Sequence, residues 1–208
     1  MNTTSPLKQR QRFAVIDLEG VLLPELWIAI ADYTDVDALR ITTRDEPDYD
    51  ILMAHRMQAL SKHDITVPTI KKALRDVKPL AGAYEFLLKL RSVMPLVILS
   101  DTFEQLALPL MAQLGWPTLM CHTFVLNDNE IVDYKLRTTD QKAKAVAAFQ
   151  SLNYKVVAAG DSYNDVTMLS KADIGILFRA SENVLTEYPE LPSCTEYEDL
   201  LHLLTAES

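Results

Sequence analysis

The chain has 208 residues, 49% of them hydrophobic and 24% charged, which is enough for one buried core and a small accessory domain. Its formal net charge of −9 excludes the basic surface that nucleic acid or an anionic membrane requires, so we expect neither as a partner. The two cysteines, Cys121 and Cys194, form no CxxC motif and predict a reducing, cytoplasmic environment. The sequence carries no signal for an oligomeric state.

The first twelve residues are polar and include one lysine and two arginines. The apolar run that begins at Phe13 is interrupted by Asp17 and Glu19, so this end is neither a secretory signal nor a membrane span. We predict that residues 1–12 form a disordered or loosely attached N-terminal extension, and that the first strand begins at Phe13.

After Gly20 the apolar residues change to helical spacing. Three apolar stripes occur: Leu26, Ile30 and Ala31; Leu52, Met53, Met57 and Leu60; and Ile70, Ala73, Leu74 and Val77. A polar loop at residues 42–48 separates the first two stripes. We therefore predict a small helical insert over residues 23–78, closed by Pro79.

Beyond Pro79, helical and strand patterns alternate. The patterns predict helices over residues 82–91, 103–114, 140–152, 164–171 and 197–204, strands over 96–99, 155–159 and 174–177, and a hairpin of residues 123–126 and 130–134. Such alternation implies right-handed crossovers and an α/β fold with a doubly wound parallel sheet. Residues 13–22 and 79–208 would form this core.

Three polar turns each follow a strand of the predicted sheet. Asp17 and Glu19 follow the first strand, Ser100 and Asp101 the second, and Asp161, Asn164 and Asp165 the third. Ligands of parallel sheets bind beyond the carboxyl ends of the strands, so we expect Asp17, Ser100 and Asp161 to lie at one edge. Several carboxylates tolerate one another there only if a cation lies among them. A single such turn often only caps the next helix, but three in order favour a catalytic site.

The acidic residues of these turns suit phosphoryl transfer. A carboxylate in the position of Asp17 can attack phosphorus if a divalent ion and hydrogen-bond donors neutralise the phosphoryl oxygens. Glu19 could protonate the leaving oxygen and then deprotonate the attacking water. Asp161, with Asp165 as a further candidate, would hold a hard cation such as Mg²⁺.

The remaining charge of such a site should come from a lysine. Lys142 and Lys144 both lie at the start of the helix before the third strand, and their position leaves both as candidates. The Ser100 hydroxyl and the backbone amides after it would donate to the transferring phosphoryl group.

Together these segments resemble the four motifs of the haloacid dehalogenase superfamily of phosphotransferases. They are Asp17-Leu18-Glu19-Gly20-Val21, Ser100-Asp101-Thr102, a downstream lysine, and Gly160-Asp161-Ser162-Tyr163-Asn164-Asp165. The helical insert resembles the cap of phosphoserine phosphatases. The match is closer still to the bacterial bifunctional phosphoserine phosphatase/homoserine phosphotransferases, through residues 17–22, 24–25, 42–45, 47–50, 98–103 and 158–165. The resemblance runs from about residue 13 to about residue 199.

The resemblance implies an aspartyl-phosphate intermediate on Asp17. It implies Mg²⁺ held by Asp17, the backbone carbonyl of Glu19 and Asp161, with Asp165 in an outer shell. Phosphoserine would be the substrate, and homoserine would be a possible second acceptor of the phosphoryl group.

The resemblance also assigns the phosphate contacts, to Ser100, Asp101 and a lysine. Family members place this lysine at the start of a helix after a hairpin, which favours Lys142 over Lys144. Asn164 would lie near the phosphate.

Glu19 departs from the family pattern, since most of the superfamily has Asp at this position. Glu is one methylene longer, so its carboxyl must fold back or the acceptor must lie farther from Asp17. One hypothesis is that this geometry favours a larger acceptor hydroxyl over water. The alternative is that Glu19 does the work of Asp from an adjusted backbone.

Phosphoserine carries a carboxylate and an ammonium besides its phosphate, so its pocket should supply a cation and an anion. Arg56 and Glu25 match the positions that serve these groups in phosphoserine phosphatases. The residues alone fit equally a solvated helix arginine paired with an acid and a first-turn glutamate favoured by the helix dipole. Arg44 is a weaker candidate, on a loop that could close over the site. Met53 and Met57 are expected in the core, with one of them a candidate for the pocket wall.

Two alternatives to this function remain. The chain could be a phosphatase of another small monoester, such as a sugar phosphate or a nucleotide. A nucleotide would call for stacking surfaces, for which Trp27, Tyr33 and Tyr49 are the candidates. The chain could also be a catalytically silent binding protein on the same fold, although such proteins usually lack the nucleophile, and Asp17 is present.

Overall fold

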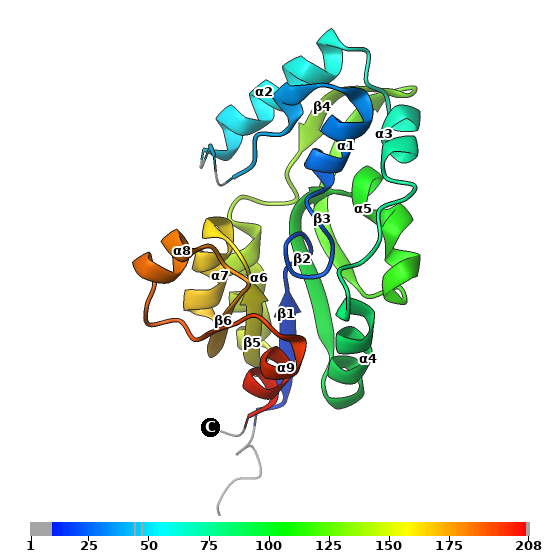
Figure 1. Cartoon of the computed structure of the whole chain (residues 1–208). Coiled ribbons are helices and arrows are strands. Elements are labelled where there is room, and N and C mark those ends of the chain that lie inside the picture. Colours follow the sequence, from blue (N-terminus) through cyan, green and yellow to red (C-terminus); the bar gives the residue numbers. More distant parts are fainter. Residues whose placement is uncertain (1–9, 44, 47, 207–208) are drawn as a thin grey trace, which may run out of the picture.

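The computed structural model describes residues 10–43, 45–46 and 48–206, and it confirms the predicted α/β class (Figure 1). Seven strands form one sheet in the order β4-β3-β2-β1-β5-β6-β7. The strands are β1 Arg12–Ile16, β2 Leu96–Phe103, β3 Leu119–Asn127, β4 Glu130–Lys135, β5 Lys155–Gly160, β6 Ile174–Phe178 and β7 Ser193–Cys194. Only the β3–β4 pair is antiparallel in this sheet, and it forms the predicted hairpin.

Helices precede, connect and follow these strands. The α-helices are α1 Leu26–Thr34, α2 Tyr49–Lys62, α3 Val67–Ala73, α4 Ala83–Val93, α5 Glu104–Met111, α6 Gln141–Ser151, α7 Val166–Lys171, α8 Glu182–Glu187 and α9 Tyr197–Thr205. Short 3-10 helices are η1 Asp37–Leu39, η2 Ala112–Leu114 and η3 Tyr163–Asp165. No helix in the described ranges combines the length and the apolar character needed to cross a membrane.

The two faces of the sheet are covered by different helices. Alternate strand residues such as Val15, Val97 and Ala158 pack against α6, α7 and α8. Their neighbours, such as Ile16 and Ile98, pack against α4, α5 and α9. Both sets are fully or almost fully buried, which explains why these strands are continuously apolar and why the sheet is doubly wound.

Strand β1 lies at the centre of the sheet, between β2 and β5. Ile16 is opposite Ile98 on one side and Ala159 on the other. Because the three strands run parallel, the turns that follow them emerge at the same edge. The amide of Asp17 continues this pairing by donating to the carbonyl of Ala159 at 2.9 Å.

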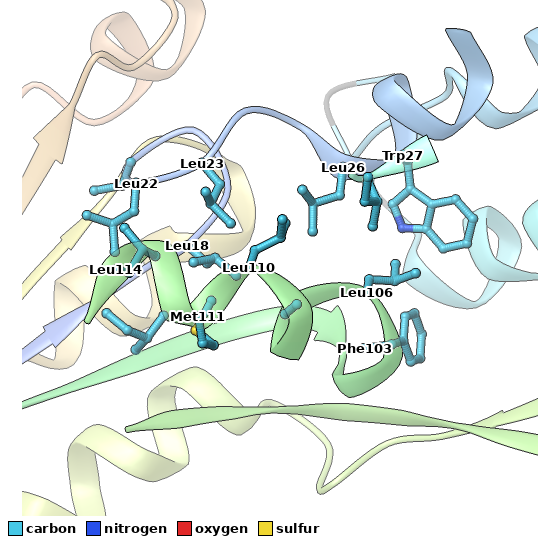
Figure 2. Packing of buried hydrophobic residues seen from close by; sticks show 14 of the residues in the cluster. Leu18, Leu22, Leu23, Leu26, Trp27, Phe103, Leu106, Leu110, Met111 and Leu114 are labelled. Atoms are coloured by element: carbon cyan, nitrogen blue, oxygen red, sulfur yellow. The ribbon is translucent and has the colours of Figure 1, made fainter. Parts of the chain in front are cut away.

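The helices α1, α2 and α3 form a cap above this edge (Figure 1). The segment that leads to them carries the leucines Leu18, Leu22 and Leu23, all fully buried. Figure 2 shows these leucines beside the α5 side chains, and the cluster continues through Leu26 and Trp27 of α1. One continuous apolar cluster therefore joins the cap to the core.

The N-terminal prediction needs a correction. Strand β1 begins at Arg12, not at Phe13, and Arg12 donates to the carbonyl of Leu204 at 3.2 Å. Arg10 forms an ion pair with Asp173. Residues 10–12 are therefore attached to the core, whereas residues 1–9 of the predicted extension lie outside the described residues.

Several predicted element bounds also differ from those observed. Strand β2 runs on to Phe103, which pairs with His122, so the next helix begins one residue later than predicted. Helix α3 ends at Ala73, before the last residues of its apolar stripe. The helix predicted over 164–171 begins as η3, because the Ser162–Asp165 capping box first forms a tight 3-10 turn. Helix α8 and strand β7 were not predicted.

Candidate active site

The ammonium of Lys142 lies among the carboxylates at the edge of the sheet. Lys142 Nζ is 2.8 Å from Asp17 Oδ1, 2.7 Å from Asp165 Oδ1 and 3.4 Å from Asp101 Oδ2. The side chains of Lys142, Asp17 and Asp165 are at most 5% exposed. The protein itself thus supplies one cation among the carboxylates.

These charges shift one another's pKa values. Burial, together with the Asp165 carboxylate, raises the pKa of Asp17 well above its usual value, and Lys142 opposes this shift. Burial lowers the pKa of Lys142, but Asp165, Asp17 and Asp101 outweigh it and raise the pKa well above its usual value. The site therefore holds a firmly protonated lysine and more acidic groups than this lysine alone can neutralise.

The acidic cluster fits a divalent cation such as Mg²⁺. Asp17, Asp161 and Asp165 each offer a carboxylate oxygen within 4.8 Å of the others, and all three are buried. Asp165 Oδ2 accepts from the amides of Asp161 and Ser162, at 2.9 and 3.2 Å, and its Oδ1 accepts from Lys142. Asp165 therefore orients the third turn and the lysine, while Asp17 and Asp161 offer the hard oxygen ligands that Mg²⁺ prefers.

Gly20 allows the first and third turns to approach each other. Its φ is +80°, and a Cβ at this position would lie 2.4 Å from Cγ of Asp161. Any other residue would be strained and would collide with the carboxylate. The glycine therefore permits the close packing of Asp161 against the turn that carries Asp17.

Ser100 and Asp101 lie within β2 and not in the turn that the sequence predicted after it, and Asp101 is the centre of a hydrogen-bond network there. Its Oδ1 accepts from Gln141 Nε2 at 2.9 Å and its Oδ2 from Asn164 Nδ2 at 3.1 Å, while His122 Nε2 lies 3.6 Å from Oδ1. Gln141 also donates to the carbonyl of Ser100 at 2.7 Å. Burial disfavours the ionised form of Asp101, but the lysine and these donors outweigh it and hold its pKa well below the usual range.

A cavity lies between this edge and the cap. Its lining includes Asp17, Glu19, Glu25, Arg56, Ser100, Asp101, Asp161 and Asn164. From the cap side it is bounded by Tyr49, whose hydroxyl donates to the carbonyl of Asp101 at 2.9 Å. The structure thus brings together residues from the two turns after β1 and β5, from β2 and from the cap.

Arg56 of α2 reaches this cavity as a buried cation. It is 5% exposed, its NH2 donates to the carbonyl of Ile41 at 2.9 Å, and its guanidinium lies 4.4 Å from the ring centre of Trp27. Burial lowers the pKa of Arg56 to about 10, so it stays charged at neutral pH. Among the described residues no carboxylate lies within ion-pair distance of it. The alternative of a solvated arginine paired with an acid is therefore wrong.

The Glu19 carboxylate extends toward the cap. Its Oε2 accepts from the backbone amide of Leu26, the first residue of α1, at 2.8 Å. Burial and the neighbouring Glu25 raise the pKa of Glu19 to about 7, against the effect of the Leu26 amide. Glu25 occupies the N-cap position itself, and its side chain makes no capping hydrogen bond. Glu19 therefore caps the helix in its place.

The other candidates lie elsewhere. Lys144 is exposed and donates to Thr139 Oγ1 at 2.8 Å, so of the two lysines it is Lys142 that contacts Asp17. Arg44 lies outside the described residues. Met53 is fully buried and Met57 packs against the core, and neither lines the cavity.

The aromatic candidates for nucleotide stacking offer little open surface at the site. Tyr33 is 55% exposed and does not line the cavity. Trp27 and Tyr49 do line the cavity, but the Trp27 ring is buried against Arg56 and the Tyr49 hydroxyl is bound to the Asp101 carbonyl.

Sequence reasoning missed two polar residues that hold the site. Gln141 and His122 are 2% and 3% exposed and contact Asp101 from α6 and β3. The position of Gln141 next to Lys142 was a signal that could have found it. No pattern in the sequence marks His122, because it lies in a strand of ordinary composition.

The chain is similar to known proteins over most of its length. A family model described as haloacid dehalogenase-like hydrolase matches residues 12–173. "Phosphoserine phosphatase ThrH" of Pseudomonas aeruginosa is 53% identical over 188 residues, which cover 90% of this chain and 92% of that protein. "Phosphoserine phosphatase" of Pseudomonas syringae pv. tomato is 50% identical, over 90% of this chain and 79% of that protein.

The fold is also shared with solved structures. A structure described as a phospho-aspartyl intermediate analogue of phosphoserine phosphatase has a TM-score of 0.76 and 19% identity, over 90% of this chain and 94% of that one. At this identity the likeness concerns the fold. The family match covers most of the chain, and the chain belongs to the haloacid dehalogenase-like hydrolases.

Proposed function

We propose that this hydrolase is a Mg²⁺-dependent phosphoserine phosphatase that also transfers the phosphoryl group to homoserine. The observation that carries the proposal is the placement of two buried cations: Arg56 lines the cavity, and Lys142 lies behind the Asp17 carboxylate that lines the same cavity. Lys142 is bound to the Asp17 carboxylate, and Arg56 lies in the cap with no carboxylate partner among the described residues. The first suits a phosphoryl group and the second the carboxylate of an amino acid. The relative named a phosphoserine phosphatase, at 53% identity, supports the same substrate.

The reaction begins with attack of an Asp17 carboxylate oxygen on the phosphorus of phosphoserine. The bond from phosphorus to the serine oxygen breaks as the aspartyl-phosphate forms, and Glu19 gives its proton to the departing oxygen. Glu19 then takes a proton from water, whose oxygen attacks the phosphorus and releases Asp17 and inorganic phosphate. The Ser100 hydroxyl, the Lys142 ammonium and the Asn164 amide donate hydrogen bonds to the phosphoryl oxygens.

Mg²⁺ would be held by Asp17, Asp161 and the backbone carbonyl of Glu19, with Asp165 outside the ligands. The bound ion supplies positive charge to the phosphoryl oxygens. Asp101 would donate its backbone amide to the phosphate, while its carboxylate keeps neighbouring donors in place. Chelation should remove activity on phosphoserine and added Mg²⁺ should restore it, measured as phosphate release.

Substrate selection falls to the cap. Arg56 would bind the carboxylate of phosphoserine through two parallel N–H···O bonds, and Glu25 would bind its ammonium. Both side chains line the same cavity as Asp17 and Ser100. A small phosphomonoester that lacks either charged group should therefore be a poorer substrate.

Transfer would use the same intermediate with a different acceptor. The homoserine hydroxyl gives its proton to Glu19 while its oxygen attacks the aspartyl-phosphate on Asp17. We propose that Glu19, held toward the cap by the amide of Leu26, leaves room for this larger acceptor. Glu19→Asp should then lower the ratio of transfer to hydrolysis. An unchanged ratio would favour the view that Glu19 only replaces Asp.

We also propose that the enzyme acts in the cytoplasm. Neither Cys121 nor Cys194 forms a disulfide. Burial raises the pKa of Cys121 to about 12 and that of Cys194 to about 11, so both stay protonated and weakly reactive. Such free thiols are typical of a reducing compartment.

The deciding experiment is incubation with phosphoserine and Mg²⁺, with and without homoserine, while free phosphate and phosphohomoserine are measured together. Both products are expected when homoserine is present. Free phosphate alone would reduce the function to hydrolysis. Activity on sugar phosphates or nucleotides without activity on phosphoserine would favour a phosphatase of another small monoester. Inactivity on every monoester would favour a catalytically silent binding protein.

A further inference from the structure

We propose that Trp27 is a positioning residue that fixes the guanidinium of Arg56 and thereby selects substrates that carry a carboxylate. The inference rests on the proposed function, because it takes Arg56 as the group that binds the carboxylate of phosphoserine.

The first support is the stacking of Arg56 on the indole. Arg56 Cζ lies 4.4 Å from the centre of the Trp27 ring, and the two residues are 5% and 2% exposed. A cation over an aromatic face is attracted most strongly by Trp, and more strongly when the pair is removed from water. The indole face therefore stabilises both the charge and the place of the guanidinium.

The second support is the weakness of the other contacts of Arg56. A guanidinium has five N–H donors. In the described part of the chain, NH2 donates to the Ile41 carbonyl, NH1 approaches the Met53 sulfur at 3.9 Å, and Nε has no hydrogen-bond partner. A thioether sulfur is only a weak acceptor. The Glu19 and Glu25 carboxylates favour its charge but lie beyond ion-pair distance, so they do not fix its orientation. With one good hydrogen bond, the guanidinium is oriented by the indole and keeps donors for a ligand.

The third support is the aromatic contact of Trp27 with the core. The rings of Trp27 and Phe124 of β3 meet nearly at right angles, 6.3 Å between their centres, and Phe124 stacks on Phe103 at 3.9 Å. Phe103 ends β2, the strand that also carries Ser100. Figure 2 shows Trp27 from α1 and Phe103 from β2 in the same apolar cluster.

This aromatic column connects the two ends of the substrate site. Aromatic rings have few rotatable bonds and pack at fixed contact distances. The column therefore sets the spacing between Arg56 in the cap and the phosphate contacts at the end of β2. Phosphoserine must reach both at once, so a change of this spacing should affect it more than an ester that has no carboxylate.

The test compares phosphoserine with phosphoethanolamine, which has the phosphate and the ammonium but lacks the carboxylate. The kcat/KM ratio of the two substrates is measured for the wild type, Trp27→Leu and Trp27→Phe. We expect the ratio to fall by about tenfold in Trp27→Leu, mainly through a higher KM for phosphoserine. Trp27→Phe keeps an aromatic face, so its kcat/KM ratio should fall less. Trp116→Leu is the control, because Trp116 is 65% exposed, and its ratio should stay at the wild-type value.

Two results would overturn the inference. An equal loss on both substrates would show that Trp27 only packs the core. A wild type that does not act on phosphoserine would overturn the proposed function and this inference with it. If thermal melting shows that Trp27→Leu is unfolded, Trp27→Phe and Phe124→Leu carry the test, since the second removes the aromatic contact of the indole with the core.

Discussion

Two buried cations, Lys142 in the core and Arg56 in the cap, are held in opposite ways. Lys142 Nζ lies within 3.4 Å of three carboxylates. Arg56 has a carbonyl, a sulfur and an indole face, and no carboxylate within ion-pair distance in the described ranges. Burying a charge is costly unless a partner compensates it. The core cation is thus compensated before any substrate arrives, whereas the cap cation has donors to offer.

The difference also separates the two tasks of the site. The core edge is a network in which Lys142, Asp165 and Asp101 fix one another. The cap is joined to it by apolar packing and by single hydrogen bonds from Tyr49 and to Glu19. The chemistry therefore rests on a preorganised network, while recognition of the amino-acid part rests on a cation that its ligand completes.

The largest effect is expected from Lys142→Met. The change leaves the Asp17 and Asp165 carboxylates buried without their cation, so we expect the free energy of unfolding to fall by about 3–5 kcal/mol in metal-free buffer. Loss of a donor to the phosphoryl group should lower kcat/KM on phosphoserine by about 10²–10³-fold. Urea unfolding and steady-state kinetics measure the two losses.

Lys144→Met is the matched control for that change, because Lys144 lies two residues away and is exposed. We expect its unfolding free energy to stay within about 0.5 kcal/mol of the wild type. An activity loss in Lys144→Met similar to that in Lys142→Met would remove the distinction between the two lysines.

Arg56→Met should give the opposite pattern. KM for phosphoserine should rise by about 30-fold, since loss of a charge-assisted hydrogen-bond pair costs roughly 2 kcal/mol. The unfolding free energy should change by less than about 1 kcal/mol or even increase, because an apolar side chain replaces a buried charge whose carboxylate neighbours, Glu19 and Glu25, lie beyond ion-pair distance. Urea unfolding and substrate titration test both parts. A stability loss as large as that of Lys142→Met would contradict the contrast between the cations.

The sequence predicts those parts of the fold and the site whose residues are adjacent along the chain. The apolar run at Phe13 and the turn at Asp17 are adjacent, and so are their counterparts in β2 and β5, which made the common edge predictable. Strand β7 has two residues and α8 six, too few to show a period. The position of Gln141 next to Lys142 could have marked it, but its contact with Ser100 could not be predicted, because the two residues are 41 positions apart.

Separation along the sequence also prevented a prediction of which groups compensate the charges of Lys142 and Arg56. Arg56 and Trp27 could each be named as candidates from the sequence, but the stacking of one on the other depends on how α1 and α2 pack. Its position made Lys142 a candidate together with Lys144, and the resemblance favoured Lys142, but only the fold shows which carboxylates surround it. Local sequence patterns identify candidate functional residues, whereas tertiary packing determines which residues they contact.

A smaller effect is expected from Gln141→Leu. This variant tests whether the hydrogen-bond network around Asp101 affects catalysis through a residue that does not itself contact Asp17. The change removes the donor to the Ser100 carbonyl and to Asp101, at 2.7 and 2.9 Å. A buried acceptor left unpaired costs about 1–3 kcal/mol, so kcat/KM on phosphoserine should fall by about tenfold. Gln150→Leu is the control on the same helix, because Gln150 bonds the Lys171 carbonyl away from the site. Equal activities of the two variants would show that the network does not extend to Gln141.

The smallest effect concerns a surface ion pair, which gives the reference for both buried cations. Arg10 and Asp173 pair with side chains 40% and 16% exposed. Burial raises the pKa of Asp173, but the Val156 amide, Arg10 and Gln150 outweigh it and lower the pKa below its usual value. A lowered folded-state pKa stabilises the protein above the unfolded value of about 4, and this contribution is lost as the pH falls through the folded value.

Asp173→Asn should therefore reduce the unfolding free energy near pH 7 by about 1 kcal/mol or less. The difference from the wild type should shrink below about pH 4, where the carboxyl of the wild type takes up its proton. Urea unfolding at a series of pH values measures this, and Arg10→Met should reproduce only the part that comes from the ion pair. If the difference in unfolding free energy between Asp173→Asn and the wild type grew as the pH fell, the result would contradict a lowered pKa of Asp173. A loss at pH 7 as large as that of Lys142→Met would mean that burial does not distinguish the core cation from one at the surface.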